Sequence, residues 1–190
     1  MNRRITALLL ALMMALGAPL ALAEMTGDEK IAAITEVVKA YIKEEGYNFD
    51  HDEEDDIFTG SFELDSTLGS CDVKVYVYDD MLAVSASPSL KVPAKYRDNM
   101  AVFLTLANYD EYYSQFRMDY EDGYLNARSA QVIENVIPTT KEVETLMMMA
   151  ILTLDDYGNG INKVALGLDP QEVYMETRQA IDGPATDKSL

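Results

Sequence analysis

The chain has 190 residues, 33 of them acidic and 15 basic, so its formal net charge is −18 at pH 7. A charge of this sign repels nucleic acids and anionic membrane surfaces, which excludes proteins that bind them through basic patches. The single cysteine and the single histidine exclude an internal disulfide framework and a zinc site with the usual nitrogen and sulfur ligands.

The N-terminal segment has the pattern of an export signal. Arg3 and Arg4 precede a long apolar run, and Ala21 and Ala23 supply the small side chains of a cleavage site. We therefore expect cleavage before Glu24 and export to the cell envelope or the extracellular space, with no membrane span afterwards. The mature chain keeps all 33 acids and 13 of the 15 basic residues, so its expected net charge is −20.

Three parts of the chain are expected. Residues 1–23 form the signal peptide, residues 24–180 form a single domain, and residues 181–190 form a flexible tail. The length that remains after cleavage suits one hydrophobic core, and no repeat of fixed period divides it.

A helix and three strands are predicted first. Apolar residues recur at helical spacing over residues 31–42, and Gly46 suits the end of that helix. Alternating apolar and polar residues, together with valine and tyrosine, then predict strands over residues 58–64, 73–78 and 81–86.

A second helix follows an irregular link. Pro88 and Pro93 predict that residues 87–92 stay outside any helix or central strand. Residues 96–109 then show helical spacing with apolar side chains on nearly every face. Such a helix is expected to be buried all round.

A hairpin is predicted after this helix. Residues 115–120 alternate as a half-buried strand. Asp122 and Gly123 can adopt the positive φ of a tight turn, and residues 124–130 are expected to return as the antiparallel partner.

The final elements are two helices. The first is predicted from Thr140, as its N-cap, to Tyr157, and residues 158–160, with two glycines, are expected to end it. Asp169 and Pro170 then begin a last helix that reaches about Ala180.

The order of these elements is α-βββ-α-ββ-α, with one further helix. Hairpin-connected strands separated by helices predict an α+β fold. We expect an antiparallel sheet of about five strands, with helices packed on it.

The same elements resemble the YbjN-type domain, a family described as bacterial sensory transduction regulators with the fold of type III secretion chaperones. The resemblance covers about residues 31–167 and lies in the order and spacing of the elements more than in a catalytic signature. It is carried by residues 58–64, 73–80, 106–109, 116–123, Arg128 and 157–161. It implies a protein that has no established catalytic activity and that binds other proteins, often as a dimer.

The tyrosines are the candidate partner-binding residues. Eight of the twelve lie between Tyr76 and Tyr124, and tyrosine offers a large contact area with a polar tip. The expected partner is a protein or peptide, or a second copy in a homodimer, and not nucleic acid. The residues proposed to contact it are Tyr76, Tyr78, Tyr109, Tyr112 and Tyr113.

The acidic run over residues 48–56 suggests an alternative, a calcium-responsive sensor or buffer. Calcium takes six to eight oxygen ligands, which the carboxylates of Asp50, Asp52, Glu54 and Asp56 could supply in part. The run lacks the glycine and the final glutamate of an EF-hand loop, so a solvated, mobile linker is the preferred interpretation.

No residue is predicted to be catalytic and no cofactor is expected. His51 lies within the acidic run, where a mobile loop could not hold an imidazole in place for catalysis. No glycine-rich nucleotide motif is present. A carboxylate-dependent hydrolase is the least favoured alternative, because no acid lies in a sequence context that would raise its pKa. Cys71, at the start of a strand, is expected to be a small buried residue.

Overall fold

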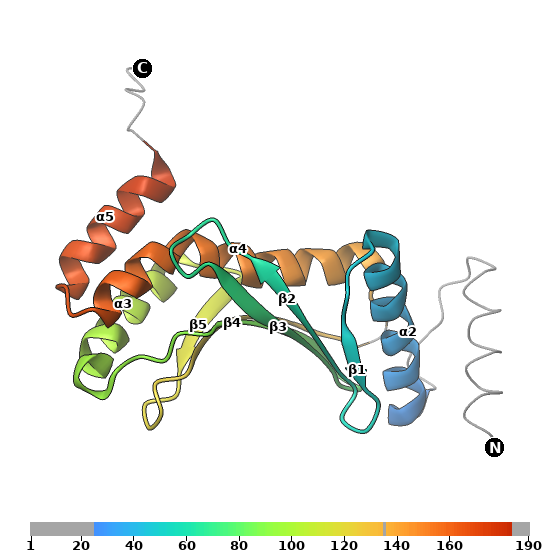
Figure 1. The fold of residues 1–190 in the computed structure, drawn as a ribbon. Helices are drawn as coiled ribbons and strands as arrows, with labels where there is room; N and C mark the ends of the chain where they lie inside the picture. Colours follow the sequence, from blue (N-terminus) through green and yellow to red (C-terminus); the bar gives the residue numbers. More distant parts are fainter. Residues whose placement is uncertain (1–24, 135, 184–190) are drawn as a thin grey trace. The chain divides into compact units, whose positions relative to one another are not determined.

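The computed structural model describes residues 25–134 and 136–183. The predicted signal peptide and residues 184–190 of the predicted tail lie outside these ranges. Along the chain the elements are α2 (Gly27–Glu45), β1 (Asp50–Asp52), β2 (Ile57–Glu63), β3 (Ser70–Val77), β4 (Met81–Pro88), the short 3-10 helix η2 (Ala94–Tyr96), α3 (Arg97–Asp110), β5 (Ser114–Met118), β6 (Leu125–Val132), α4 (Thr140–Ala165) and α5 (Pro170–Asp182) (Figure 1).

The six strands form one open antiparallel sheet in the order β1-β2-β3-β4-β6-β5. The α+β class and the antiparallel sheet are therefore confirmed. The strand count differs by one, because the acidic run contributes β1, which pairs with β2 from Asp50 opposite Thr59 to Asp52 opposite Ile57. Pairing with β2 supplies the hydrogen bonds that this run could not supply by itself.

The chain divides into two compact units. The first unit comprises the described parts of Met1–Gly60, Lys74–Val84 and Ala130–Met148, and the second comprises Ser61–Val73, Ser85–Ser129 and the described part of Met149–Leu190. Each unit draws on three separate stretches of the chain.

In the first unit, α2 forms as its sequence predicts. Thr26 and Glu29 make a reciprocal capping box at its start, and Gly46 ends it with a φ of 70°, a conformation that suits glycine. One stripe of the helix is buried. Its members are Ala33, Ile34, Thr35, Val37, Val38 and Tyr41.

The two strands that follow the first hairpin differ in burial. In β3 the valines Val73, Val75 and Val77 are buried and Lys74 is exposed, which confirms the predicted alternation. In β4 every residue from Leu82 to Pro88 is buried, and the strand lies between β3 and β6. The expectation that proline would keep residues 87–92 out of a central strand is therefore wrong for its first two residues.

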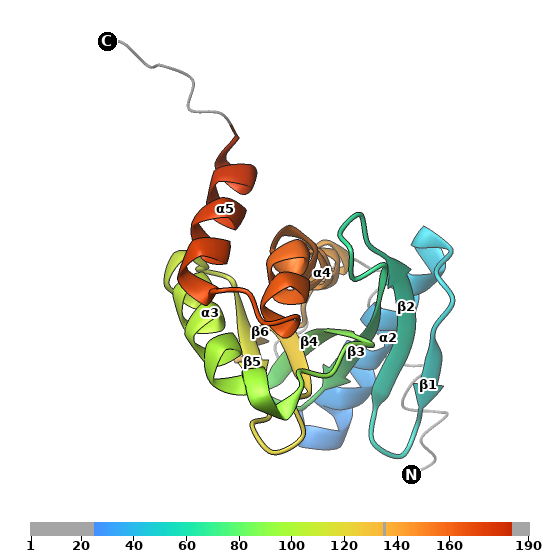
Figure 2. The same ribbon diagram turned by 60° about the vertical axis from the view of Figure 1, so that its left-hand side comes forward.

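In the second unit, α3 is buried on one face only. Met100, Phe103, Leu104 and Ala107 are buried, whereas the side chain of Val102 is 40% exposed. The expectation of burial all round is wrong, because α3 packs against β5 and α5 along one side and leaves the other side to solvent (Figure 2).

The β5–β6 hairpin is antiparallel as predicted, but the prediction of a tight turn at Asp122 and Gly123 is wrong, because residues 119–124 link the two strands and only Gly123 of this pair has a positive φ. Gly123 has a φ of 78°, and its N–H donates to the carbonyl oxygen of Asp119 at 2.9 Å. β5 ends at Met118, earlier than expected, so Tyr120 lies in the turn and is 55% exposed.

The ring of Tyr157 lies at the centre of the core of the second unit. It is fully buried and meets the rings of Phe103 and Phe116 edge-on, with centroid distances of 6.3 and 5.5 Å. Edge-to-face contacts of this kind add stability beyond the burial of apolar area. They join α4, α3 and β5.

The long helix α4 begins and ends differently from the prediction. Its capping box uses Thr139, whose hydroxyl accepts a bond from the N–H of Glu142, so the N-cap lies one residue before Thr140. The helix then continues through Gly158 and Gly160 to Ala165. The predicted helix end at these glycines is wrong.

Gly158 and Gly160 allow side chains from other segments to pack closely against α4. A Cβ atom at Gly158 would lie 2.3 Å from the hydroxyl oxygen of Ser66, and one at Gly160 would lie 2.5 Å from the Phe103 ring. Cβ atoms cannot approach neighbours this closely. Glycine is required here by tertiary contacts and not by the helix.

Gly160→Ala should lower the free energy of unfolding by about 1–3 kcal/mol, because the added methyl group overpacks the core. Helix propensity alone predicts the opposite sign, since alanine is favoured over glycine inside a helix by about 1 kcal/mol. Urea denaturation followed by circular dichroism measures the difference. The double variant Gly160→Ala/Phe103→Leu should recover part of the loss, and a single variant as stable as the parent would contradict the packing argument.

Candidate partner-binding surface

Three tyrosines stand out from the surface of the second unit. Tyr109, Tyr112 and Tyr113 are 87, 88 and 73% exposed, at the end of α3 and in the three-residue link to β5. Tyrosine carries a large apolar ring, so this exposure leaves contact area available to a partner. We call these three residues the tyrosine cluster.

The backbone that carries the tyrosine cluster is held in place by its neighbour Asp110. The carboxylate of Asp110 accepts a bond from the hydroxyl of Tyr174, and its Oδ2 lies 3.1 Å from Nε of Arg178. Burial and the Asp110 bond raise the pKa of the Tyr174 phenol to about 12. The chain is therefore anchored at Asp110 while the tyrosines on either side remain in solvent.

Asn108 closes part of the adjacent sheet edge. β5 is the last strand in the order of the described residues, so one side of it has no strand neighbour. The side-chain oxygen of Asn108 accepts from the N–H of Phe116 at 2.7 Å, and its amide donates to the Phe116 carbonyl at 3.0 Å. Strand addition by a partner is disfavoured here, because the middle of this edge is already paired.

The other two candidate tyrosines belong to the first unit. The rings of Tyr76 and Tyr78 stack with a centroid distance of 6.5 Å and an interplanar angle of 3°. Tyr78 is 41% exposed, whereas Tyr76 is half-buried. The five candidate residues therefore form two separate sets, one in each unit.

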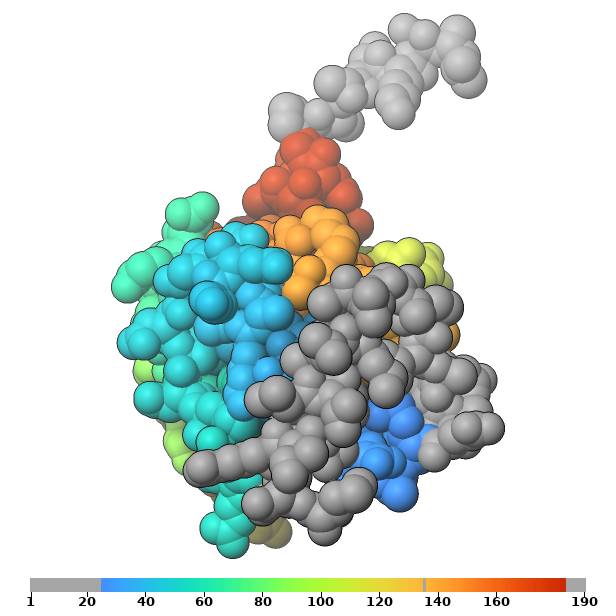
Figure 3. Space-filling view, turned by 90° about the vertical axis from the view of Figure 1, so that its right-hand side faces the viewer, coloured from blue at the N-terminus to red at the C-terminus, as the bar shows by residue number. Residues whose placement is uncertain are grey.

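The acidic run forms a strand and a turn and not a mobile linker, which corrects the sequence-based interpretation. Asp50 and Asp52 lie in β1 with exposed side chains, and the turn that follows lies at the surface (Figure 3). Within the turn, Oδ1 of Asp52 accepts from the N–H of Glu54 at 3.0 Å. Among residues 25–134 and 136–183, no group of three or more His, Cys, Asp or Glu side chains could hold a metal ion.

His51 packs within this region as part of the structure. Its ring lies flat on Phe58, with a centroid distance of 4.0 Å and an interplanar angle of 7°. Its Nε2 is buried without a hydrogen bond and lies 3.7 Å from Oδ1 of Asp56. The stacking on Phe58 gives His51 a packing role.

Two acids in the second unit have raised pKa values, which the sequence did not predict. Burial raises the pKa of Glu111 and of Asp156, and for Asp156 the neighbouring Asp155 adds to the increase. The buried Tyr157 phenol also has a raised pKa because of its burial. No local sequence signal marks these acids, because their burial comes from contacts between distant segments.

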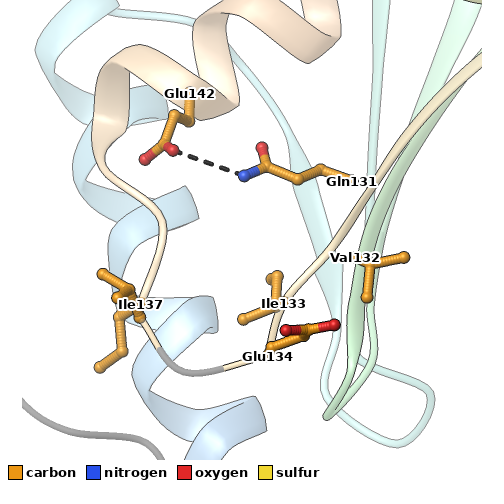
Figure 4. Close-up of a pocket in the computed structure, with 7 residues that line it drawn as sticks. Gln131, Val132, Ile133, Glu134, Ile137 and Glu142 are labelled. Atoms are coloured by element: carbon orange, nitrogen blue, oxygen red, sulfur yellow. Dashed lines mark hydrogen bonds between the residues drawn. The ribbon is translucent and has the colours of Figure 1, made fainter.

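Two hollows lie within the described part of the chain. One of about 310 Å³ in the first unit is lined by Gln131 and Glu142, which share a hydrogen bond of 3.4 Å, and by several aliphatic residues (Figure 4). Another of about 320 Å³ lies in the second unit between the C-terminal part of α4 and α5. Its Lys163 is paired with Glu176, and its Asn159 is bonded to the N–H of Thr67.

Two further expectations concern Cys71 and the membrane. Cys71 is 1% exposed, which confirms that it is a buried residue, and burial raises its pKa to about 11. Within the described part of the chain, no helix has the length and apolar character needed to span a bilayer.

Comparison with known proteins identifies one family. The model of the YbjN family, described as "Putative bacterial sensory transduction regulator", matches residues 35–163. No curated protein matches the chain. Among solved structures, a crystal structure of an uncharacterized protein from Methanothermobacter thermautotrophicus aligns with a TM-score of 0.38 and 14% identity, over 77% of this chain and 98% of that chain. A similarity at this level supports no argument about function.

Asn108→Ala should lower the free energy of unfolding by about 1–2 kcal/mol, because two part-buried main-chain groups of Phe116 lose their partner. It should also increase concentration-dependent self-association, since it opens the edge of β5. Sedimentation velocity over a range of concentrations measures the second effect. Thr105→Ala, a nearby exposed change on α3, serves as the control, and a variant that stays as monodisperse as this control would refute the edge-closing role.

Glu111→Gln should stabilise the protein at neutral pH and not at acidic pH. The folded pKa of Glu111 is raised, so its stabilising contribution is complete below the unfolded pKa of about 4.3 and is lost as pH rises through the folded pKa. The neutral amide avoids that loss. Urea midpoints at about pH 7.5 and about pH 4 test this, with the exposed Glu172→Gln as control, and an equal gain at both pH values would contradict it.

Proposed function

The chain belongs to the YbjN family, whose model covers residues 35–163, and on that premise we propose that it is an exported, non-catalytic module that regulates by binding another protein. The observation that carries the proposal is the tyrosine cluster. Its three aromatic side chains are at least 73% exposed, and Asp110, which lies between Tyr109 and Tyr112 in the chain, is hydrogen-bonded to Tyr174. Aromatic anchors on a rigid support are typical of the residues that contribute most to protein interfaces.

The arrangement of chemical groups favours binding over catalysis. His51 is stacked on Phe58, and Cys71 is buried with a raised pKa, so neither is placed as a reactive group. The lysine and asparagine side chains around the hollow of the second unit are engaged with other residues of the same unit. The acids of the run over residues 50–56 do not converge, so we do not favour the calcium alternative.

The charge of the chain indicates the kind of partner. The formal net charge is −18, and removal of the N-terminal basic residues with a signal peptide would make it −20. Charge complementarity increases the association rate and rejects acidic partners. We therefore infer a basic protein or peptide, encountered in the envelope or outside the cell, as the partner.

Replacement of the tyrosine cluster should strongly weaken binding of the partner. The immobilised mature chain is used to capture proteins from the extracytoplasmic fraction, and captured proteins are compared with those held by Tyr109→Ser/Tyr112→Ser/Tyr113→Ser. Loss of aromatic anchors that contribute about 2 kcal/mol or more should weaken capture at least about thirtyfold. The replaced side chains are exposed, so circular dichroism and the urea midpoint should not change.

Two control variants make the test specific. Tyr120→Ser removes an exposed tyrosine from the hairpin of the same unit and should retain the partner. Tyr78→Ser tests the second set of candidate tyrosines independently. Capture of the same proteins at the same yield by the triple variant would refute the tyrosine cluster as the binding surface.

A further inference from the structure

The last helix, α5, is strongly amphipathic. On one face Pro170, Val173 and Thr177 are buried, and the side chains beside them are half-buried. The opposite face is exposed throughout and comprises Gln171, Glu172, Met175, Glu176, Gln179, Ala180 and Asp182. Its N-terminus is capped by Asp169, the residue just before the helix, whose Oδ1 accepts from the N–H groups of two residues of the first turn.

The site in the second unit that α5 occupies, which we call the seat, has two parts. One is a space without a side chain, the notch, and the other is a residue that makes polar contacts, the clamp. The notch is Gly160 of α4, where a Cβ atom would lie 2.6 Å from the hydroxyl oxygen of Thr177. The clamp is Asp110 of α3, which binds the hydroxyl of Tyr174 and Nε of Arg178. Together with Phe103 these residues define the seat, which receives a small residue and, on the same helical face, an arginine.

The residues of the seat lie inside the part of the chain that the family model matches, and α5 lies outside it. Phe103, Asp110 and Gly160 all lie within the residues that the family model matches, which end at residue 163, whereas α5 begins at Pro170. The part of the chain shared with the family therefore supplies the seat. The helix that fills it is contributed from outside the matched region.

Some of the contacts that hold α5 are exposed to solvent. Only three of its side chains are buried. The ion pair of Lys163 with Glu176 joins side chains that are 46 and 62% exposed, so it contributes little. Elements with few buried contacts and exposed ion pairs belong to the least stable part of a protein and open most readily.

We propose that the seat of α5 docks a basic amphipathic helix of a partner protein, and that α5 is the built-in competitor for this seat. The inference rests on the proposed function, in that it takes the chain to be a protein-binding module, and it names the class of partner. The seat adjoins the tyrosine cluster through Asp110, whose chain neighbours on either side lead to Tyr109 and Tyr112. A helix in the seat would therefore lie at the border of the proposed binding surface.

Charge selects a basic helix over a second copy of α5. The exposed face of α5 carries acidic and no basic side chains, and the rest of the chain is also strongly acidic. Two copies exchanging α5 would bring like charges together, which costs binding energy. A helix with lysine or arginine on its outer face and the inner face of α5 would keep the notch and clamp contacts and gain attraction.

A labelled peptide tests the proposal on the full-length chain. The peptide spans residues 169–183 with lysine at positions 171, 172 and 179, all on the exposed face. Fluorescence anisotropy compares its binding to the unmodified chain and to Arg178→Ala/Tyr174→Phe, in which the native α5 is held less firmly. We expect at least tenfold tighter binding to the variant, and weaker binding as salt concentration rises.

Three comparisons make the result specific. The same peptide with Arg178→Glu should bind the variant chain at least tenfold more weakly, because it repels Asp110. The chain variant Met175→Ala, a change on the exposed face of α5, should behave like the unmodified chain. Hydrogen exchange of the α5 amides should increase when the peptide binds the unmodified chain, since the peptide displaces the native helix.

Equal affinity of the peptide for the unmodified chain and the variant, or no binding to either, would overturn the proposal. Equally tight binding of the unaltered acidic sequence would overturn it as well, because the seat would then accept α5 of a second copy. If the variant does not fold by circular dichroism, Arg178→Lys takes its place. A triple tyrosine variant that loses its captured partner while the peptide fails to bind would leave the proposed function standing and remove only this inference.

Discussion

The packing around the ring of Tyr157 is the constraint on which the second unit depends. This ring is fully buried between Phe103 of α3 and Phe116 of β5, and it lies next to glycines that allow α4 to approach its neighbours closely. A larger residue at Gly158 or Gly160 would separate these elements. Because α3 is held in this way, its last residue, Asp110, is in position to bind α5.

Near Asp110, the side chains that stabilise the fold differ from those that are exposed to a partner. Asp110 points to Tyr174 and Arg178, whereas Tyr109 on one side and Tyr112 on the other remain in solvent. A partner thus meets side chains carried by a segment that is anchored at Asp110, and preorganisation of this kind lowers the entropic cost of association. The amide of Asn108 also removes a main-chain edge that would otherwise invite unspecific strand pairing.

Elements with strong local signals were predicted from the sequence. The capped helix α2 and the alternating strand β3 each depend on interactions between residues close in the chain, so their patterns were sufficient. Elements decided by distant contacts were predicted incorrectly. The acidic run became β1 because β2 pairs with it, and α4 passed its glycines because Ser66 and Phe103 occupy the space beside them.

The sequence by itself determined the acidic charge, the α+β order of elements and the presence of many tyrosines, because these are properties of composition and local pattern. Only the tertiary structure decided which tyrosines are exposed, that Tyr157 is buried while Tyr109, Tyr112 and Tyr113 are not, and that Glu111 and Asp156 have raised pKa values. Burial is the physical reason for this division. It depends on segments such as α3, α4 and α5 that lie far apart in the chain and meet only when the protein folds.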